Sequence, residues 1–110
     1  MTVIVCKANS DISIRSTGAS SFDDIAEIVR SSNDESTLVE ELPVTHEVNA
    51  DHSIFVAQGV VGDKTNAIAS ALTNKESTGC CAIYRHDDKG NLIDFDNDSL
   101  LALMKVCCSI

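Results

Sequence analysis

The sequence predicts a single α+β domain: a mostly antiparallel sheet of about six strands with three helices on one face, in two layers. Three observations carry this prediction. Short apolar or alternating runs recur along the chain, turn residues separate them in pairs, and a segment with helical apolar spacing follows each pair. A chain of 110 residues is also the usual length of one domain. The expected hairpin-helix units span residues 2–32, 44–75 and 79–108.

The first unit begins with a run of β-branched residues. Residues 2–8 (TVIVCKA) are apolar on both faces, which favours a strand in the interior of the sheet. Residues 12–15 alternate isoleucine with polar side chains, as expected for a strand with one wet face. Ser21 then precedes Asp24 by three positions, a variant of the capping box, and a helix is predicted over residues 21–31.

The second unit follows an acidic stretch, residues 31–43, whose pattern fits a loop, a short helical turn or an edge strand. Pro43 ends this stretch, because proline lacks the N–H group that continues regular structure. Apolar and polar side chains then alternate over residues 44–48, which predicts a strand. A second strand is expected over residues 52–58, and an alanine-rich helix over residues 64–74.

The third unit shows the pattern most clearly. Strands are predicted over residues 80–85 and 92–95, and a turn rich in Asp, Gly and Asn separates them. Asn97 or Asp98 is expected to cap a final helix that runs through Cys108. The strings NSDISI and NADHSI lie forty positions apart and favour an internal repeat of ββα units. Ordinary turn chemistry explains the two matching strings equally well.

The charge balance narrows the class of partner. The net charge of −9 comes from 17 acidic and 8 basic residues, and no two basic residues are adjacent. Direct binding to DNA or RNA requires clustered lysine and arginine, so it is not expected. An anionic membrane surface would repel the chain for the same reason. The options that remain are basic surfaces, cations or no partner.

The amino-terminal sequence and the pattern of cysteines both predict a cytoplasmic protein. The amino-terminal apolar run has no basic region before it and is short for a signal peptide, and no stretch has the length of a membrane span. The five cysteines include two adjacent pairs, whose side chains point to different sides of a regular element. Free thiols in a reducing compartment explain this pattern better than a disulfide framework.

No segment passes the test for a known chemical motif. In Arg85–Asp98, aligning Gly90 with the glycine of a calcium loop places Arg85 where that loop requires an aspartate. Residues 59–65 have two residues between their glycines where a phosphate loop has four. The cysteines and histidines lack the spacing of a zinc site. No metal, cofactor or catalytic residue is therefore expected.

The final helix is apolar nearly all round, with Lys105 as the only charge within its body. A helix of this kind must be covered on most sides. Neighbouring helices provide one form of cover, and a homodimer seam or partner-binding face provides another. The residues expected at a self-association face are Leu101, Met104 and Cys108.

The leading hypothesis is a non-enzymatic cytoplasmic protein that docks on a basic protein surface as an inhibitor or antagonist. Its acidic side chains could imitate nucleic-acid phosphates, as in inhibitors of nucleic-acid enzymes carried by phages or mobile elements. The residues expected to contact the partner are Glu35, Glu40, Glu41, Asp87 and Asp88.

Two alternatives remain. The first is a small oligomeric enzyme or ligand-binding domain with a cleft near residues 59–64 that uses His46 or His52. The second is a structural subunit whose only activity is assembly. An ordinary solvated surface would also explain the acidic side chains without any partner.

Overall fold

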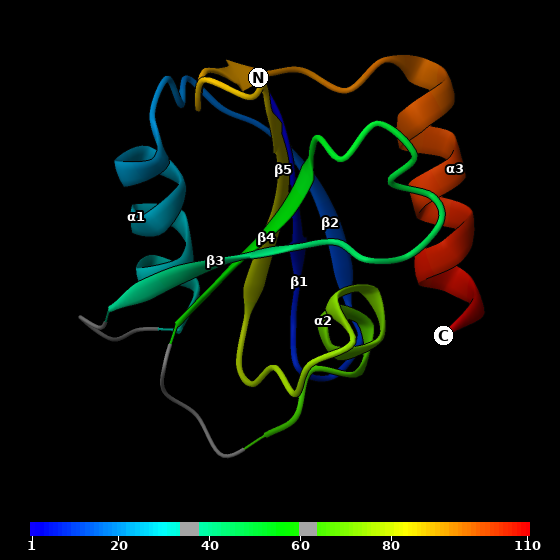
Figure 1. Cartoon of the computed structure of the whole chain (residues 1–110). Helices are drawn as coiled ribbons and strands as arrows, with labels where there is room; N and C mark the ends of the chain where they lie inside the picture. The colour runs from blue at the N-terminus through cyan, green and yellow to red at the C-terminus, as the bar shows by residue number, and fades with distance from the viewer. Residues whose placement is uncertain (34–37, 60–63) are drawn as a thin grey trace.

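The computed structural model describes residues 1–33, 38–59 and 64–110 (Figure 1). It confirms the α+β class, with six antiparallel strands in one sheet and three helices. Strand, strand and helix follow one another three times along the chain. The elements are β1 (Thr2–Cys6), β2 (Ile12–Ser16), α1 (Phe22–Asn33), β3 (Val39–Pro43), β4 (Ile54–Gly59), α2 (Ala67–Thr73), β5 (Cys81–His86), β6 (Leu92–Ile93) and α3 (Asn97–Ser109).

Strand β5 lies at the centre of the sheet, whose order is β2-β1-β5-β4-β3, with the short β6 paired to β5. The two strands of each unit pair with one another, and β5 joins the first unit to the second through β1 and β4. Cys6 lies opposite Cys81 across the β1–β5 pair, and Val56 lies opposite Ile83 across the β4–β5 pair.

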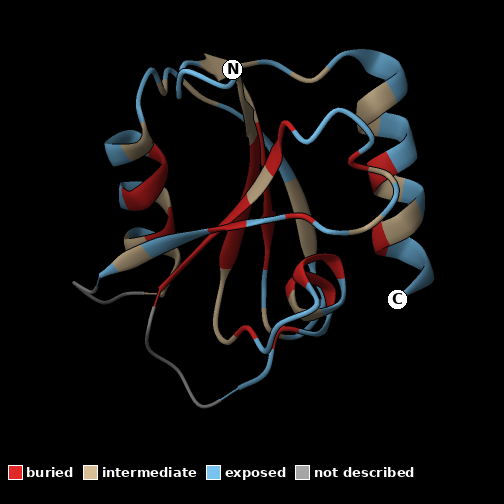
Figure 2. Ribbon diagram, viewed as in Figure 1, coloured by how far each residue is buried: buried red, intermediate tan, exposed pale blue. Residues whose placement is uncertain are grey.

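The helices cover both faces of the sheet rather than the one face that the sequence predicted (Figure 1). Helix α1 packs on the face formed by residues such as Val5 and Tyr84. Helices α2 and α3 pack on the opposite face, around residues such as Ile4 and Ile83. All four side chains are at most 1% exposed, and the buried segments in Figure 2 follow the central strands. Strands that are apolar on both sides need cover on both sides.

The predicted strand over residues 44–48 is wrong, and the strand that pairs with β4 is β3 instead. The side chain of Asn49 closes the intervening segment into a loop. Its amide nitrogen donates to the carbonyl oxygens of Val44 and Ile54, at 2.7 and 3.1 Å, and its oxygen accepts from the Ile54 N–H at 2.9 Å. Val44 and Val48 still pack against the core, so a loop with inward apolar residues produced the alternation of a strand.

Two polar side chains set the start of the later helices. Asn66, which is fully buried, caps α2: its oxygen accepts from the Ala69 N–H at 3.0 Å, and its nitrogen donates to the carbonyls of Cys6 and Gly79. Asp96 caps α3 by accepting from the Ser99 N–H at 2.6 Å, and it lies one residue before the nearer of the two predicted caps, Asn97. Each cap satisfies a helix N–H that has no partner within its own helix.

Candidate functional site

The five acidic residues predicted to bind a partner do not form one patch. Glu40 and Glu41 are neighbours on β3, so their side chains point to opposite faces of the sheet. The Glu40 carboxylate accepts a hydrogen bond of 2.6 Å from the Gln58 side chain. Glu41 instead enters a cluster on the face that α1 covers, described below. Glu35 lies outside the described residues.

Glu41, Tyr84, His86 and Phe55 form this cluster, in which two side chains meet one carboxylate oxygen. The Tyr84 hydroxyl donates to Glu41 Oε1, and His86 Nε2 lies 2.7 Å from the same atom. The His86 ring stacks on Phe55, with 3.8 Å between ring centres and 8° between planes. The four residues come from β3, β4 and β5, three strands that lie side by side in the sheet.

Both ring nitrogens of His86 face acceptors. Nε2 meets the Glu41 carboxylate, and Nδ1 lies 2.6 Å from the Asp87 carbonyl oxygen. Only the doubly protonated imidazole donates to both acceptors when Glu41 is ionised. Burial, together with the Glu41 carboxylate, raises the pKa of the Tyr84 hydroxyl, which therefore stays protonated. This arrangement ties β3 to β5 and engages both ring nitrogens of His86.

Asp87 and Asp88 lie in the turn between β5 and β6, and they differ in role. Asp87 Oδ1 accepts from the backbone N–H groups of Asn91 and Lys89, both at 2.9 Å. These contacts, led by that from Asn91, hold the pKa of Asp87 below its usual range. Gly90 closes the turn with φ of +85°, a conformation that favours glycine. Asp88 is exposed, and its side chain makes no hydrogen bond or ion pair within the described parts of the chain.

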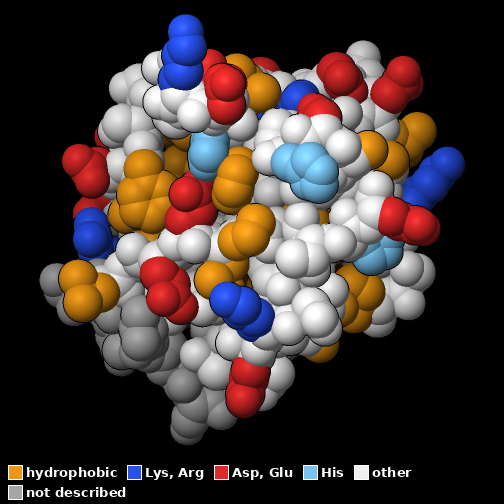
Figure 3. Space-filling model, viewed as in Figure 1, with side chains coloured by type: hydrophobic (Ala, Val, Ile, Leu, Met, Phe, Trp, Pro, Cys, Tyr) orange, Lys and Arg blue, Asp and Glu red, His pale blue; other side chains and the backbone are white. Residues whose placement is uncertain are grey.

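The strand directions place most of the described acidic residues at one end of the molecule. The start of β1 and β4 and the ends of β2, β3 and β5 all lie at that end. Figure 3 shows acidic side chains along the corresponding upper part of the molecule, with a few basic ones among them. We call this region the acidic end; its members are Asp23, Asp24, Glu47, Asp51, Asp87, Asp88, Asp94, Asp96 and Asp98.

The opposite end has a different charge balance. It is formed by the β1–β2 turn and the segment between α2 and β5, and within the described residues it carries two acidic side chains, Asp11 and Glu76. Three lysines share that end: Lys7, Lys64 and Lys75. The acidic end carries nine carboxylates against three basic side chains, Arg15, Arg85 and Lys89. Among the residues that the structure describes, the charges are therefore distributed unevenly along the strands.

Arg85 holds part of the acidic end together. Its guanidinium donates to Asp51 Oδ2 and to Ser53 Oγ, both at 2.9 Å, and to the Asp94 carbonyl at 3.1 Å. Asp94 in turn accepts from the Thr2 N–H at 2.8 Å, and its carboxylate lies 3.9 Å from the amino terminus. Arg85 thus fixes the loop before β4 and the segment before α3 relative to one another.

A hollow of about 590 Å³ opens between the loop before β4 and the β5–β6 turn. Its lining combines aromatic and acidic side chains with the engaged Arg85, and its members are Asp51, His52, Ser53, Phe55, Arg85, His86, Asp87, Asp88 and Ile93. The charges in this hollow suit a cationic side chain better than an anion, because Arg85 is already engaged by acceptors.

Among the described residues, the two histidines proposed for an enzyme or ligand-binding cleft lie at the other end of the sheet from Gly59 and Lys64. His46 and His52 both line a hollow of about 450 Å³ at the acidic end. Gly59 and Lys64 lie at the opposite end, a distance of about the six residues of β4, or roughly 17 Å at the usual rise of a strand. Residues 60–63 of that predicted cleft lie outside the described residues. His46 Nδ1 accepts from the Val48 N–H at 3.1 Å, a local contact within its loop.

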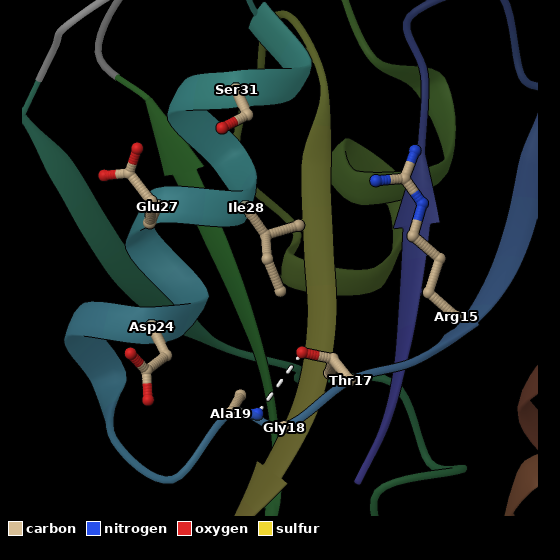
Figure 4. A pocket seen from close by; sticks show the side chains of 8 residues that line it. All are labelled: Arg15, Thr17, Gly18, Ala19, Asp24, Glu27, Ile28 and Ser31. Carbon is tan, nitrogen blue, oxygen red and sulfur yellow. Dashed lines mark hydrogen bonds between the residues drawn. The ribbon is translucent and has the colours of Figure 1, made fainter.

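A further hollow of about 420 Å³ lies between β2 and α1 (Figure 4). Arg15 forms one wall, and Asp24 and Glu27 lie on the α1 side, with Ile28 between them. Asp24 also accepts from the Ser20 N–H at 2.9 Å, and this contact lowers its pKa. The mixed charges of these walls give no indication of one ligand class.

The three residues predicted for self-association fall within one arc of about 60° on α3, but they differ in exposure. Leu101 is 58% exposed and Cys108 is exposed, whereas Met104 is partly buried against the core. Leu103 and Cys107 form the fully buried side of the helix. Neighbouring elements therefore cover one side of α3, and Leu101 lies on the open side.

Neither the cysteines nor the carboxylates assemble a metal centre in the described regions. No group of three or more His, Cys, Asp or Glu side chains there could hold a metal ion. Cys6, Cys81 and Cys107 are buried in one core cluster, where burial raises the pKa of the Cys81 thiol to about 12. In the same parts of the chain, no helix combines the length and apolar character needed to cross a bilayer.

The cluster around His86 is what sequence reasoning missed. Tyr84 and His86 alternate on one strand, so they share a face, and that signal was present. The contribution of Glu41 depends on the pairing of β3 with β4. The sequence pattern instead predicts that residues 44–48 form the strand next to β4. Comparison of the chain with protein-family models, with curated proteins and with solved structures found no match.

Proposed function

We propose that the chain is a cytoplasmic, non-enzymatic binding protein whose acidic end docks on a basic protein surface and blocks it. The observation that carries the proposal is the concentration of nine carboxylates at one end of the sheet, against two among the described residues of the other end. A field of one sign on one end orients a charged partner before contact and accelerates association.

The chemistry of the acidic end supports binding rather than catalysis. The carboxylates of Asp51, Asp87, Asp94 and Asp96 all have pKa values below their usual range, mainly because hydroxyl or N–H groups donate to them. They are ionised at neutral pH and held in place. A basic groove that normally holds nucleic-acid phosphates would meet a fixed array of negative charge, and occupation of that groove would inhibit the partner.

The docking surface differs from the five residues predicted by sequence. Glu40 lies on the other face of the sheet from Glu41, whereas Asp87 and Asp88 both line the hollow between the loop before β4 and the β5–β6 turn. We assign the contact to the exposed carboxylates around the hollow between the loop before β4 and the β5–β6 turn, with Asp88 at its rim. The Phe55–His86 stack gives this hollow an aromatic wall, which favours an arginine side chain.

The test compares two charge reversals, each of which replaces one carboxylate with lysine, at opposite ends of the molecule. Asp88 and Glu76 are both exposed, one at each end, and neither side chain makes a hydrogen bond or ion pair with another described residue. Partners are captured at low salt with the wild-type protein, identified by mass spectrometry, and purified for kinetics. We expect Asp88→Lys to slow association about 3- to 10-fold at low ionic strength, and Glu76→Lys to leave the rate nearly unchanged.

The dependence of the association rate on ionic strength and competition by nucleic acid provide two further tests. The wild-type rate should fall as ionic strength rises towards about 0.15 M, where screening acts over about 8 Å, and the difference between the variants should shrink. Nucleic acid should compete with the protein for the same partner. Equal slowing by the two reversals, or a partner whose binding ignores both salt and nucleic acid, would contradict the proposal.

A further inference from the structure

The exposed side of α3 carries a charge pattern that is complementary to itself. Asp98, Leu101, Ala102 and Lys105 are all exposed, and at about 100° per residue they cover one arc of about 100°. Asp98 and Lys105 lie along the middle of this arc, and Leu101 and Ala102 lie on its two flanks. The side chains of Asp98 and Lys105 make no ion pair or hydrogen bond with any other residue that the structure describes.

We propose that this face binds a second copy of the same chain, with the two α3 helices antiparallel about a twofold axis between Leu101 and Ala102. Positions 98 and 105, and positions 101 and 102, are symmetric about that axis. Asp98 of each protomer then faces Lys105 of the other, which forms two equivalent ion pairs. Leu101 of each protomer meets Leu101 of the other along one flank of the contact, and the two small Ala102 side chains meet along the other flank.

Two features of the molecule select a second copy in this orientation. The chain carries a net charge of −9, and most of its surface repels another copy. The α3 face carries equal numbers of positive and negative side chains, so two copies can meet there without that repulsion. An antiparallel arrangement also directs the two acidic ends away from each other, whereas a parallel arrangement would place them side by side and would pair like charges at both positions.

The proposed interface is small, so we expect its affinity to be low. Helix α3 has 13 residues, and contact along one helix face buries less than the roughly 1,000 Å² of a stable interface. We therefore expect a reversible dimer with a Kd on the order of 0.1–1 mM. Met104, which the sequence placed at a self-association face, is excluded from this contact because it packs against the core.

The test uses charge reversal in the full-length chain, with mass measured by sedimentation equilibrium from about 10 µM to about 1 mM. The wild-type average mass should rise towards that of a dimer. Asp98→Lys and Lys105→Asp should each raise the dimer Kd at least about 10-fold, because two attractive pairs become two repulsive pairs. The double variant, with both substitutions, should return to within about threefold of the wild-type Kd, which also controls for any effect of either substitution on the helix.

A mixture of the two single variants gives the sharpest readout. Asp98→Lys changes the net charge from −9 to −7, and Lys105→Asp changes it to −11, so both variants remain strongly acidic. Overall charge therefore opposes their association. In the mixed dimer, however, the first variant presents lysine at both positions and the second presents aspartate at both, so each ion pair is restored. Heterodimers should form in the mixture at concentrations where neither variant self-associates.

The matched control places the same charges elsewhere. Asp88→Lys and Lys75→Asp also have net charges of −7 and −11, and both positions are exposed and remote from the α3 face. Each should dimerise as the wild type does. A wild-type chain that stays monomeric at about 1 mM, or single reversals whose mixture and double variant show no recovery, would overturn the proposal. Neither result depends on whether the acidic end binds a basic protein.

Discussion

Asp51 shows how a single carboxylate is held at the acidic end. Ser53 donates to its Oδ1 through the hydroxyl at 2.8 Å and through the backbone N–H at 3.3 Å. Arg85 donates to its Oδ2 at 2.9 Å. The Ser53 hydroxyl is the main reason that the pKa of Asp51 lies below its usual range, and Arg85 adds to the effect.

The pKa of Asp51 predicts the direction of a pH effect on stability. A carboxyl group whose pKa is lower in the folded protein binds its proton more readily after unfolding. Its contribution is therefore fully present above the ordinary aspartate pKa of about 3.9, and it is lost as the pH falls below that value. We expect Asp51→Asn to lower the free energy of unfolding at about pH 7 by roughly 0.5–1 kcal/mol, discounted for the exposure of the side chain.

Urea unfolding from about pH 7 to about pH 3 measures this contribution. The loss of stability in acid should be shallower for Asp51→Asn than for the wild type. The control is Asp88→Asn, which removes an exposed carboxylate that makes no hydrogen bond or ion pair with another described residue, and it should follow the wild-type curve. A parallel curve for Asp51→Asn would show that its contacts contribute nothing to folding.

At the scale of the element, α3 separates core from surface within three residues. Leu103 is fully buried against the sheet, and Leu101 is 58% exposed. The two side chains have the same volume and lie in the same helix, so they form a matched pair. The hydrophobic sequence of α3 could not tell them apart, since apolar residues occur on nearly all sides of the helix.

Alanine substitution should separate the two leucines. Leu103→Ala removes a buried side chain and leaves a cavity, so we expect a loss of about 2–4 kcal/mol in the free energy of unfolding. Leu101→Ala should change it by no more than about 0.5 kcal/mol. Denaturant unfolding at protein concentrations below about 10 µM keeps the monomer as the folded species. Similar losses for both variants would contradict the assignment of α3 sides.

Strand β3 shows where prediction from the local alternation of apolar and polar residues fails. Residues 39–43 belong to an acidic stretch with three open interpretations, and residues 44–48 had the clearer alternation. Pairing with β4 selected residues 39–43, while the Asn49 side chain closed residues 44–53 into a loop. The strand β3 lies at the edge of the sheet, where Pro43 is tolerated because no strand on the open side requires the N–H group that proline lacks.

At the scale of the whole molecule, the layers decide which thiols meet solvent. Cys6, Cys81 and Cys107 are at most 2% exposed, beneath α2 and α3. Cys80 is half-buried and Cys108 is exposed. A hydrogen bond with Cys107 and burial raise the pKa of the Cys6 thiol, which further lowers its supply of reactive thiolate.

Thiol labelling should follow this order. With a disulfide reagent at about pH 8, we expect one fast reaction, at Cys108, and a slower one at Cys80. The other three thiols should react more slowly by a factor on the order of 100 or more, since they require opening of the core. The variant Cys108→Ser should lack the fast phase, and denatured protein should expose all five thiols at once. Three or more fast thiols in the native chain would contradict the packing described above.

Residue patterns that act over a few positions of the chain were enough to predict the fold class and most of the strands and helices. β-branched runs, turn residues such as Asp, Gly and Asn, and capping residues act within a few positions of the chain, so the order of strands and helices could be predicted from the sequence. The residue counts alone showed that the chain is acidic, and the residue spacing alone showed that the sequence has no recognisable catalytic, metal or nucleotide motif.

The tertiary structure alone decided which residues meet. The distribution of helices over both faces, the pairing of β3 and the contact of Glu41 with Tyr84 and His86 depend on residues far apart in the sequence. So does the gathering of acidic side chains at one end, which follows from the directions of five strands. Periodicity shows that a face is apolar, but only packing determines what covers that face and which side chains remain open to a partner.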